Sequence, residues 1–256
     1  MNSDPSVKNS SAFDPSAVAA QFDAAGRAAG FRIEKFGTIS GFPLFALTRR
    51  TPGPRPRIYL SAGIHGDEPA PPLALLRLLE RGLFDARATW FLCPLLNPVG
   101  LARGTRENAD RLDLNRDYRH LISAEIRAHI AWLQRQPRFD LALFLHEVWE
   151  AKGFYLYELN RSGRPGFAEA IIEAVRAGGP IDLSDKIDGR DASGGIIRPP
   201  GDRTQLEQWP EAAYMHAHHT TMSYGFETSS AFPLEQRIVM QCLAVETALA
   251  KFILAN

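Results

Sequence analysis

Short apolar runs alternate with stretches of helical periodicity along this chain, and that alternation is the strongest constraint on its fold. Residues 57–63 (RIYLSAG), 89–96 (TWFLCPLL) and 140–146 (DLALFLH) have the length and apolar character of strands buried on both faces. Between them, residues 72–83 and 123–136 carry apolar side chains at helical spacing. Strands alternating with helices predict an α/β fold, with a mixed, mostly parallel central sheet flanked by helices.

The remaining segments fit the same single domain, expected over residues 17–256 after a loose tail at 1–16. Residues 14–30 begin with Asp-Pro-Ser and end with glycine, which are helix start and stop signals. The other expected elements are strands at 31–37, 43–49, 154–159 and 220–227, a mobile connection at 193–202 and a long helix at 233–254.

Composition excludes several classes of function. The formal net charge is +0, which argues against a nucleic-acid binder that relies on bulk electrostatics. No apolar run approaches the ~20 residues that span a bilayer, and residues 1–16 lack a basic-then-apolar signal sequence. Cys93 and Cys242 lie in apolar surroundings, which fits two buried thiols in the cytoplasm, with a single disulfide as the alternative.

Three side chains with catalytic chemistry follow predicted strands. His65 stands in the turn SAGIHGDEPA after one strand, His146 ends another, and Glu227 ends a third. In open α/β sheets, sites form where strands end and loops begin, so these three side chains are expected to converge.

Two histidines and one carboxylate form a ligand set typical of catalytic zinc, which leaves a fourth position for water. His65, Glu68 and His146 supply that set. Zinc lowers the pKa of its water to ~7, although the same ligands also accept other divalent ions. Taken singly, His65 and Glu68 are ordinary loop residues and His146 is an ordinary core histidine, so the rest of the site must support the assignment.

The segment between the ligands carries further candidates. Residues 97–118 (NPVGLARGTRENADRLDLNRDY) contain Arg106 and Arg116, and a guanidinium can hold a carboxylate with two parallel hydrogen bonds. An arginine near the metal can also stabilise the oxyanion that forms when water attacks an amide. Asp113 is a candidate to accept the second N–H of His65.

Four motifs in this order resemble a known family. They are HGDE, TRENADRLDLNR, LFLHE and GFET, and they extend from His65 to Thr228. The chain resembles the zinc metallocarboxypeptidases of the carboxypeptidase A type. The resemblance is strongest to the small bacterial branch near murein peptide amidase and to the succinylglutamate desuccinylase/aspartoacylase group. It implies a carboxypeptidase-like fold with one zinc ion on His65, Glu68 and His146.

The resemblance also implies a role for each matching position outside the ligand set. Glu227 is then the general base that activates water and later protonates the leaving amine. Arg106 polarises the scissile carbonyl and holds the oxyanion. Asn115 and Arg116 bind the free carboxylate of the substrate.

These roles predict a zinc-dependent hydrolase that cleaves an amide bond next to a free carboxylate, as a metallocarboxypeptidase or a peptidoglycan-peptide amidase does. The substrate is then a small peptide. An N-acyl amino acid deacylase, like the desuccinylase/aspartoacylase group, uses the same residues and is the alternative. A catalytically dead carboxylate-binding protein is the third hypothesis, and it predicts a missing ligand or base, whereas all are present here.

One departure concerns a tyrosine that such carboxypeptidases carry on a mobile loop about twenty residues before the catalytic glutamate. Residues 199–219 contain only Tyr214, which lies closer to Glu227 than expected. This puts the C-terminal exopeptidase specificity in question more than the metal chemistry.

Two further stretches have open interpretations. His216, His218 and His219 in the tract HAHH suggest a second metal site, but no carboxylate or cysteine stands at ligand spacing, so a pocket-lining or surface role is preferred. Trp149 and Glu150 follow His146 directly and are candidates to line the substrate pocket.

Overall fold

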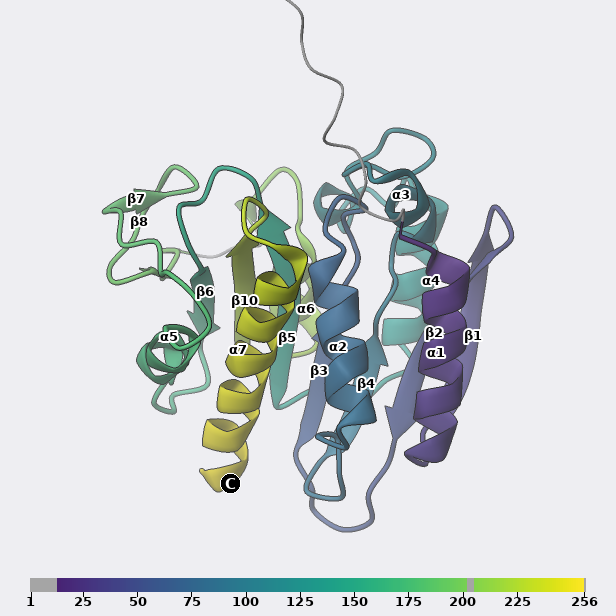
Figure 1. Cartoon of the computed structure of the whole chain (residues 1–256). Helices are drawn as coiled ribbons and strands as arrows, with labels where there is room; N and C mark the ends of the chain where they lie inside the picture. The colour runs from purple at the N-terminus through teal and green to yellow at the C-terminus, as the bar shows by residue number, and fades with distance from the viewer. Residues whose placement is uncertain (1–12, 202–204, 256) are drawn as a thin grey trace, which may run out of the picture.

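A computed structural model describes residues 13–201 and 205–255 of the chain and has a central sheet between two layers of helices (Figure 1). The helices are α1 (Pro15–Ala28), α2 (Ala70–Glu80), α3 (Pro98–Arg103), α4 (Ala124–Leu133), α5 (Ala168–Val175), α6 (Glu211–His218) and α7 (Leu234–Leu254), with a 3-10 turn, η1 (Leu114–Arg116). The strands are β1 (Arg32–Ile39), β2 (Phe42–Arg49), β3 (Arg57–Ser61), β4 (Thr89–Cys93), β5 (Leu141–Val148), β6 (Tyr155–Asn160), β7 (Lys186–Ile187), β8 (Arg190–Asp191), β9 (Ile196–Ile197) and β10 (Met222–Ser229).

The strand order within the sheet brings the candidate residues together. The order is β1-β2-β4-β3-β5-β10-β6-β9, and the central strands β4, β3, β5 and β10 run parallel. The carboxyl ends of parallel strands meet at one edge of a sheet, which is where ligand sites form. In the register between β5 and β10, His146 lies directly opposite Glu227.

Helices cover both faces of the sheet, which explains why the central strands are apolar on both sides. Helices α1, α2, α5 and α7 lie on one face, and α4 and α6 lie on the other (Figure 1). The first face has the larger apolar core, which includes Phe22, Leu75 and Phe252. The second face is aromatic, with Trp132, Tyr59 and Phe139 packed together.

The α/β fold predicted from the sequence is confirmed, with the expected strands and the long closing helix. The start signal at residue 14 acts as predicted, since the Asp14 carboxylate caps α1. The Ser123 hydroxyl caps α4 in the same way. Residues 1–12 of the predicted tail lie outside the described residues, and α1 already begins at Pro15, inside the range expected to be loose.

The mobile connection expected at 193–202 is wrong in part over residues 193–201, and residue 202 lies outside the described residues. Ile196 and Ile197 form β9, which pairs in parallel with Leu156 and Tyr157 of β6 at the edge of the sheet. Both isoleucines are buried, so apolar contact holds this two-residue strand despite the flanking glycines and prolines.

Two predictions about the chemistry of the whole chain can also be compared with the structure. Cys93 and Cys242 are both buried and free, so the alternative of a disulfide is excluded. Among the helices in the described residues, none combines the length and apolar character needed to cross a membrane.

Candidate active site

The turn after β3 brings two of the candidate ligands into place, and its glycines make this possible. Gly63 has a φ of 67°, a left-handed conformation that suits glycine. A Cβ on Gly66 would lie 1.9 Å from the carbonyl carbon of Gly100, so no side chain fits there. The turn therefore packs directly on the backbone of α3, with His65 and Glu68 on either side of this contact.

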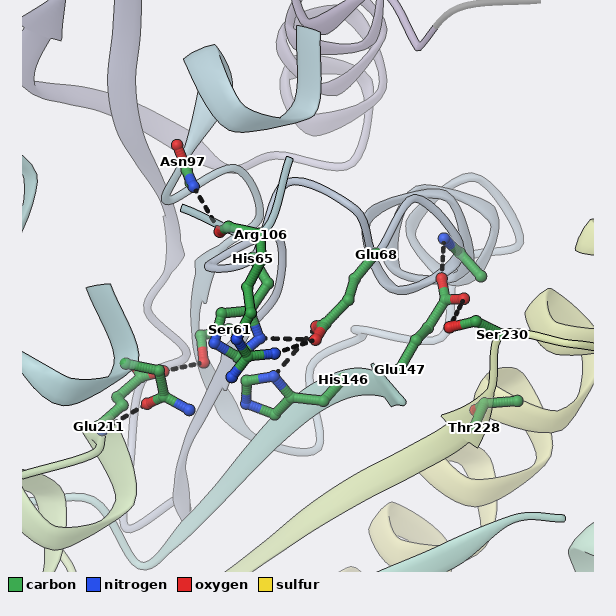
Figure 2. A network of polar contacts seen from close by, with 12 residues as sticks. Ser61, His65, Glu68, Asn97, Arg106, His146, Glu147, Glu211, Thr228 and Ser230 are labelled. Atoms are coloured by element: carbon green, nitrogen blue, oxygen red, sulfur yellow. Dashed lines mark hydrogen bonds and ion pairs between the residues drawn. The ribbon is translucent and has the colours of Figure 1, made fainter. Parts of the chain in front are cut away.

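The three candidate ligands converge in a buried cluster. Figure 2 shows the rings of His65 and His146 directed at the carboxylate of Glu68. The Nδ1 atom of His65 is 2.6 Å from one oxygen of Glu68, and the Nδ1 atom of His146 is 3.1 Å from the other. The three side chains each offer a ligand atom, and these atoms lie within 4.8 Å of one another. In the described part of the chain, no other group of three or more His, Cys, Asp or Glu side chains meets this condition.

The charges around the cluster fit a bound cation. Burial would lower the pKa of His65, but the carboxylates of Glu68 and Asp113 raise it to about 9. Burial would raise the pKa of Glu68, but the two histidines hold it below its usual value. The surroundings thus stabilise positive charge in a place shielded from water. A divalent metal ion on two imidazole nitrogens and one carboxylate satisfies this arrangement.

Asp113 links the cluster to Arg106. Its Oδ1 atom lies 3.3 Å from Nε2 of His65, so the histidine uses one ring nitrogen toward Glu68 and the other toward Asp113. Its Oδ2 atom accepts a hydrogen bond from Nε of Arg106 at 3.1 Å, and Nη1 of Arg106 lies 3.7 Å from Glu68. Arg106 is therefore held beside the ligands with part of its guanidinium open to the pocket.

Asn115 and Arg116 lie in η1, on the same pocket. The side-chain oxygen of Asn115 accepts the backbone N–H of Glu211 at 2.8 Å, which leaves the amide NH2 as a donor. Glu211 is fully buried, and its carboxylate accepts hydrogen bonds from the hydroxyls of Tyr59 at 2.7 Å and Ser61 at 2.8 Å. The start of α6 is thereby tied to β3, and the orientation of the Asn115 amide follows from it.

Glu227 completes the pocket, a cavity of about 410 Å³. All seven predicted ligand, catalytic and substrate-binding side chains line it. Asp113 does not line the pocket, but its carboxylate contacts two side chains that do, His65 and Arg106. Burial raises the pKa of Glu227 to about 8; His146 opposes this shift and Glu68 adds to it. A carboxyl group in this pocket with such a pKa is equipped to accept and return a proton near neutral pH.

Seven further polar residues line the pocket and were not predicted to do so from the sequence: Glu147, Tyr155, Tyr157, Asp188, Arg190, Glu207 and Gln208. Tyr155 and Tyr157 line it from β6, Asp188 from the turn after β7, and Arg190 from β8. The Tyr157 hydroxyl donates a hydrogen bond to Asp188. The period of two in FYLYEL indicated that these tyrosines share a face, but only the sheet order shows which face it is. Nothing in the sequence indicates that the short hairpin lies over the pocket.

Several predicted pocket residues lie elsewhere. Tyr214 is buried on α6 against Tyr118 and does not line the pocket, so it does not occupy the place expected for the loop tyrosine. Trp149 is 63% exposed, and neither it nor Glu150 lines the pocket, so that expectation is wrong. Val148, which precedes Trp149 at the end of β5, lines the pocket instead.

The histidines of HAHH lie at the end of α6 and contact neighbouring side chains. Nε2 of His216 lies 2.9 Å from the Ser223 hydroxyl, and His218 and His219 pack against the ring of Tyr214. None of them belongs to the candidate metal cluster.

Several solved structures with a similar fold carry names of the metallopeptidase or carboxypeptidase type. A protein of Shewanella amazonensis SB2B, provisionally named a metallopeptidase, matches with a TM-score of 0.82 and 25% identity over 94% of each chain. A metallo-carboxypeptidase from Burkholderia cenocepacia matches with a TM-score of 0.67 and 18% identity, over 93% of this chain and 69% of its own. Carboxypeptidase A from Helicoverpa armigera matches with a TM-score of 0.61 and 14% identity, over 94% and 70%. The last two similarities concern the fold alone.

The sequence itself shows a more particular similarity, over less than half of the chain. Residues 54–172 match the family described as the succinylglutamate desuccinylase/aspartoacylase catalytic domain. The resemblance predicted from the motifs, to zinc carboxypeptidase-like proteins near this group, is thereby confirmed. A comparison with curated protein sequences found no match.

Proposed function

We propose that this chain is a zinc-dependent hydrolase that cleaves an amide bond next to a free carboxylate. The observation that carries the proposal is the buried convergence of His65, Glu68 and His146 beside Glu227 in one pocket. The first three side chains would hold the ion. When bound, zinc would supply Lewis-acid polarisation and an acidified water molecule.

Glu227 is the proton carrier in this proposal. It takes a proton from the attacking water and delivers it to the nitrogen of the leaving amine. Its carboxyl group sits opposite His146 in the sheet, so its position relative to the ligands is set by strand pairing rather than by a loop. The raised pKa favours a group that must both accept and donate.

The arginines and Asn115 recognise charge in the substrate. Arg106, held by Asp113, presents its guanidinium to the oxygen that becomes negative during attack on the carbonyl. Asn115 and Arg116 offer an amide and a guanidinium to the free carboxylate of the substrate, and these donors are suited to a planar anion. The preferred substrate is a small peptide.

A second candidate function is N-acyl amino acid deacylation. The match of residues 54–172 to the desuccinylase/aspartoacylase catalytic domain favours it. Both reactions use the same ligands, base and arginines, and they differ in which side of the amide bears the recognised carboxylate. A panel of N-acyl amino acids, γ-glutamyl peptides and ordinary dipeptides separates them by the rate at which each is hydrolysed.

The metal content of protein purified without added metal tests the site. We expect about one zinc per chain in the wild type and loss of it in His146→Ala, because the variant lacks one of three ligands. Wild type that stays free of zinc after reconstitution, or a variant that retains it, would contradict the proposal.

The Glu227→Gln variant tests the chemistry separately from the ion. We expect it to keep its zinc and to lose ~10²- to 10⁴-fold in kcat, because the amide cannot carry the proton. Metal analysis and steady-state kinetics on the best substrate of the panel provide both readouts. Unchanged hydrolysis would rule out Glu227 as the base.

A further inference from the structure

The helix that follows the HGDE turn begins in an unusual way. The N-terminal positions of a helix leave backbone N–H groups without partners inside the helix. Here Pro69 is the N-cap and Pro71 and Pro72 follow Ala70, so only Ala70 carries an N–H among these four positions. Pro69 provides no side-chain cap. A single buried donor therefore needs a partner from another part of the chain.

That partner is Glu147, a residue to which sequence analysis gave no role. One of its carboxylate oxygens accepts the N–H of Ala70 at 2.6 Å. Its side chain is completely buried, and Figure 2 shows it directed away from the ligand cluster toward Ser230. Glu147 follows His146 in β5, and Ala70 comes two residues after Glu68. One carboxylate thus connects the strand that carries one ligand to the turn that carries the other two.

Helix α7 contributes the arginine that pairs with the Glu147 carboxylate. Arg237 forms an ion pair with the other oxygen of Glu147, and its side chain is only 13% exposed. Gln241, one turn further along α7, donates at 2.7 Å to the backbone oxygen of His146 and at 2.7 Å to the hydroxyl of Thr228. The same face of α7 therefore contacts the strand of the ligand His146 and the strand of Glu227.

We infer that Glu147, held by Arg237, is a positioning residue that fixes Glu68 relative to His146 and so sets the affinity of the site for its metal ion. The inference rests on the proposed function only in taking this cluster as the metal site. The hydrogen bonds and the ion pair of the Glu147 carboxylate go to Ala70, Ser230 and Arg237 and not to the ligand side chains, so it acts by holding the backbone that follows Glu68. Outer contacts of this kind typically contribute 10- to 100-fold to metal affinity.

The test is the dissociation constant for zinc, measured by competition with a chromophoric chelator. We expect Glu147→Ala to bind zinc 10- to 100-fold more weakly than the wild type. Glu147→Gln keeps an oxygen for the Ala70 N–H and loses the ion pair with Arg237. We therefore expect its zinc affinity to lie between those of the wild type and Glu147→Ala. Circular dichroism establishes that each variant is folded, and if Glu147→Ala does not fold, the comparison of Glu147→Gln with the wild type decides.

A matched control separates positioning from general loss of stability. Glu158 is also a buried carboxylate paired with an arginine, since it accepts from Arg198 at 2.6 Å and from the Tyr224 hydroxyl at 2.8 Å. It lies on β6 and connects no ligand segments. We expect Glu158→Ala and Glu158→Gln to lose thermal stability and to keep the zinc affinity of the wild type.

The outcomes distinguish this inference from the proposed function. Wild type that binds zinc, with Glu147 variants that bind it equally well, would overturn the inference and leave the proposed function standing. Equal losses in the Glu147 and Glu158 variants would also overturn it, because the effect would then be one of stability. Wild type without affinity for zinc would overturn both.

Discussion

At the scale of single residues, the shape of the pocket depends on a glycine in its wall. Gly225 stands two residues before Glu227 in β10, so it faces the same cavity. A Cβ at this position would lie 3.7 Å from the Cβ of Tyr157, an ordinary contact without a clash. Glycine is therefore not required by the backbone here, and its effect is to leave space between the strands.

This feature predicts a change in substrate selectivity in Gly225→Ala. We expect the variant to fold and to bind metal as the wild type does. Its kcat/KM should fall for bulky substrates relative to small ones, by ~10-fold or more, because a methyl group in a pocket changes transition-state binding by ~1–3 kcal/mol. Kinetics on the substrate panel measure this, and a uniform loss across the panel would show that Gly225 does not shape the pocket.

At the scale of elements, helices α4 and α6 are joined to β3 by a buried chain of hydrogen bonds. The hydroxyl of Tyr59 gives its proton to Glu211, so it accepts from Nε2 of His129 at 3.0 Å. Nδ1 of the same ring then accepts from the Tyr118 hydroxyl at 2.8 Å. Both nitrogens of His129 are used in its neutral form, and burial lowers its pKa to about 3.

Because the folded protein holds His129 in its neutral form, we expect the protein to lose stability in acid. The pKa of His129 is about 3 when folded and near 6.5 when unfolded, so the unfolded chain binds the proton more tightly. The contribution of neutral His129 to the free energy of unfolding is complete above pH 6.5 and is lost as the pH falls toward 3. We expect the difference in unfolding free energy between wild type and His129→Gln to shrink by ~1.4 kcal/mol per pH unit below that point. Urea unfolding at several pH values measures it, and a constant difference would contradict the assignment.

The elements also show how far the sequence predicts this fold. Long elements with clear periodicity, such as α7, were predictable because their own apolar pattern determines which face is buried. The two-residue strand β9 was not, since its formation depends on a partner strand about 40 residues earlier in the chain. The convergence of the three candidate ligands could be predicted from motif order. The contact of Glu147 with Ala70 could not, because it depends on the prolines of another segment.

At the scale of the whole molecule, the metal cluster joins segments that are far apart in sequence. His65 and Glu68 come from the turn before α2, and His146 comes from β5 in the middle of the sheet. An ion bound by all three would cross-link these parts in the folded state only. Binding to the folded state alone stabilises a protein by RT ln(1 + [metal]/Kd).

Removal of the metal should therefore lower the thermal stability of the whole domain. At a free zinc concentration ~100-fold above Kd, the stabilisation is ~2.7 kcal/mol, and for a chain of this size that is a Tm change of ~5–10 °C. Thermal scans with zinc and with a chelator measure it, and Glu227→Gln should respond as the wild type does. His146→Ala should show little response to the chelator, and a full response in that variant would place the ion elsewhere.

The contacts of α7 have a consequence for the order of events during protein synthesis. The candidate ligands and the proposed base all precede residue 228, whereas Arg237 and Gln241, which hold the strands of His146 and Glu227, emerge later from the ribosome. A growing chain thus exposes every ligand before it has the helix that arranges them. We expect tight metal capture to follow the docking of α7, so that the proposed activity appears only when translation of this helix is complete.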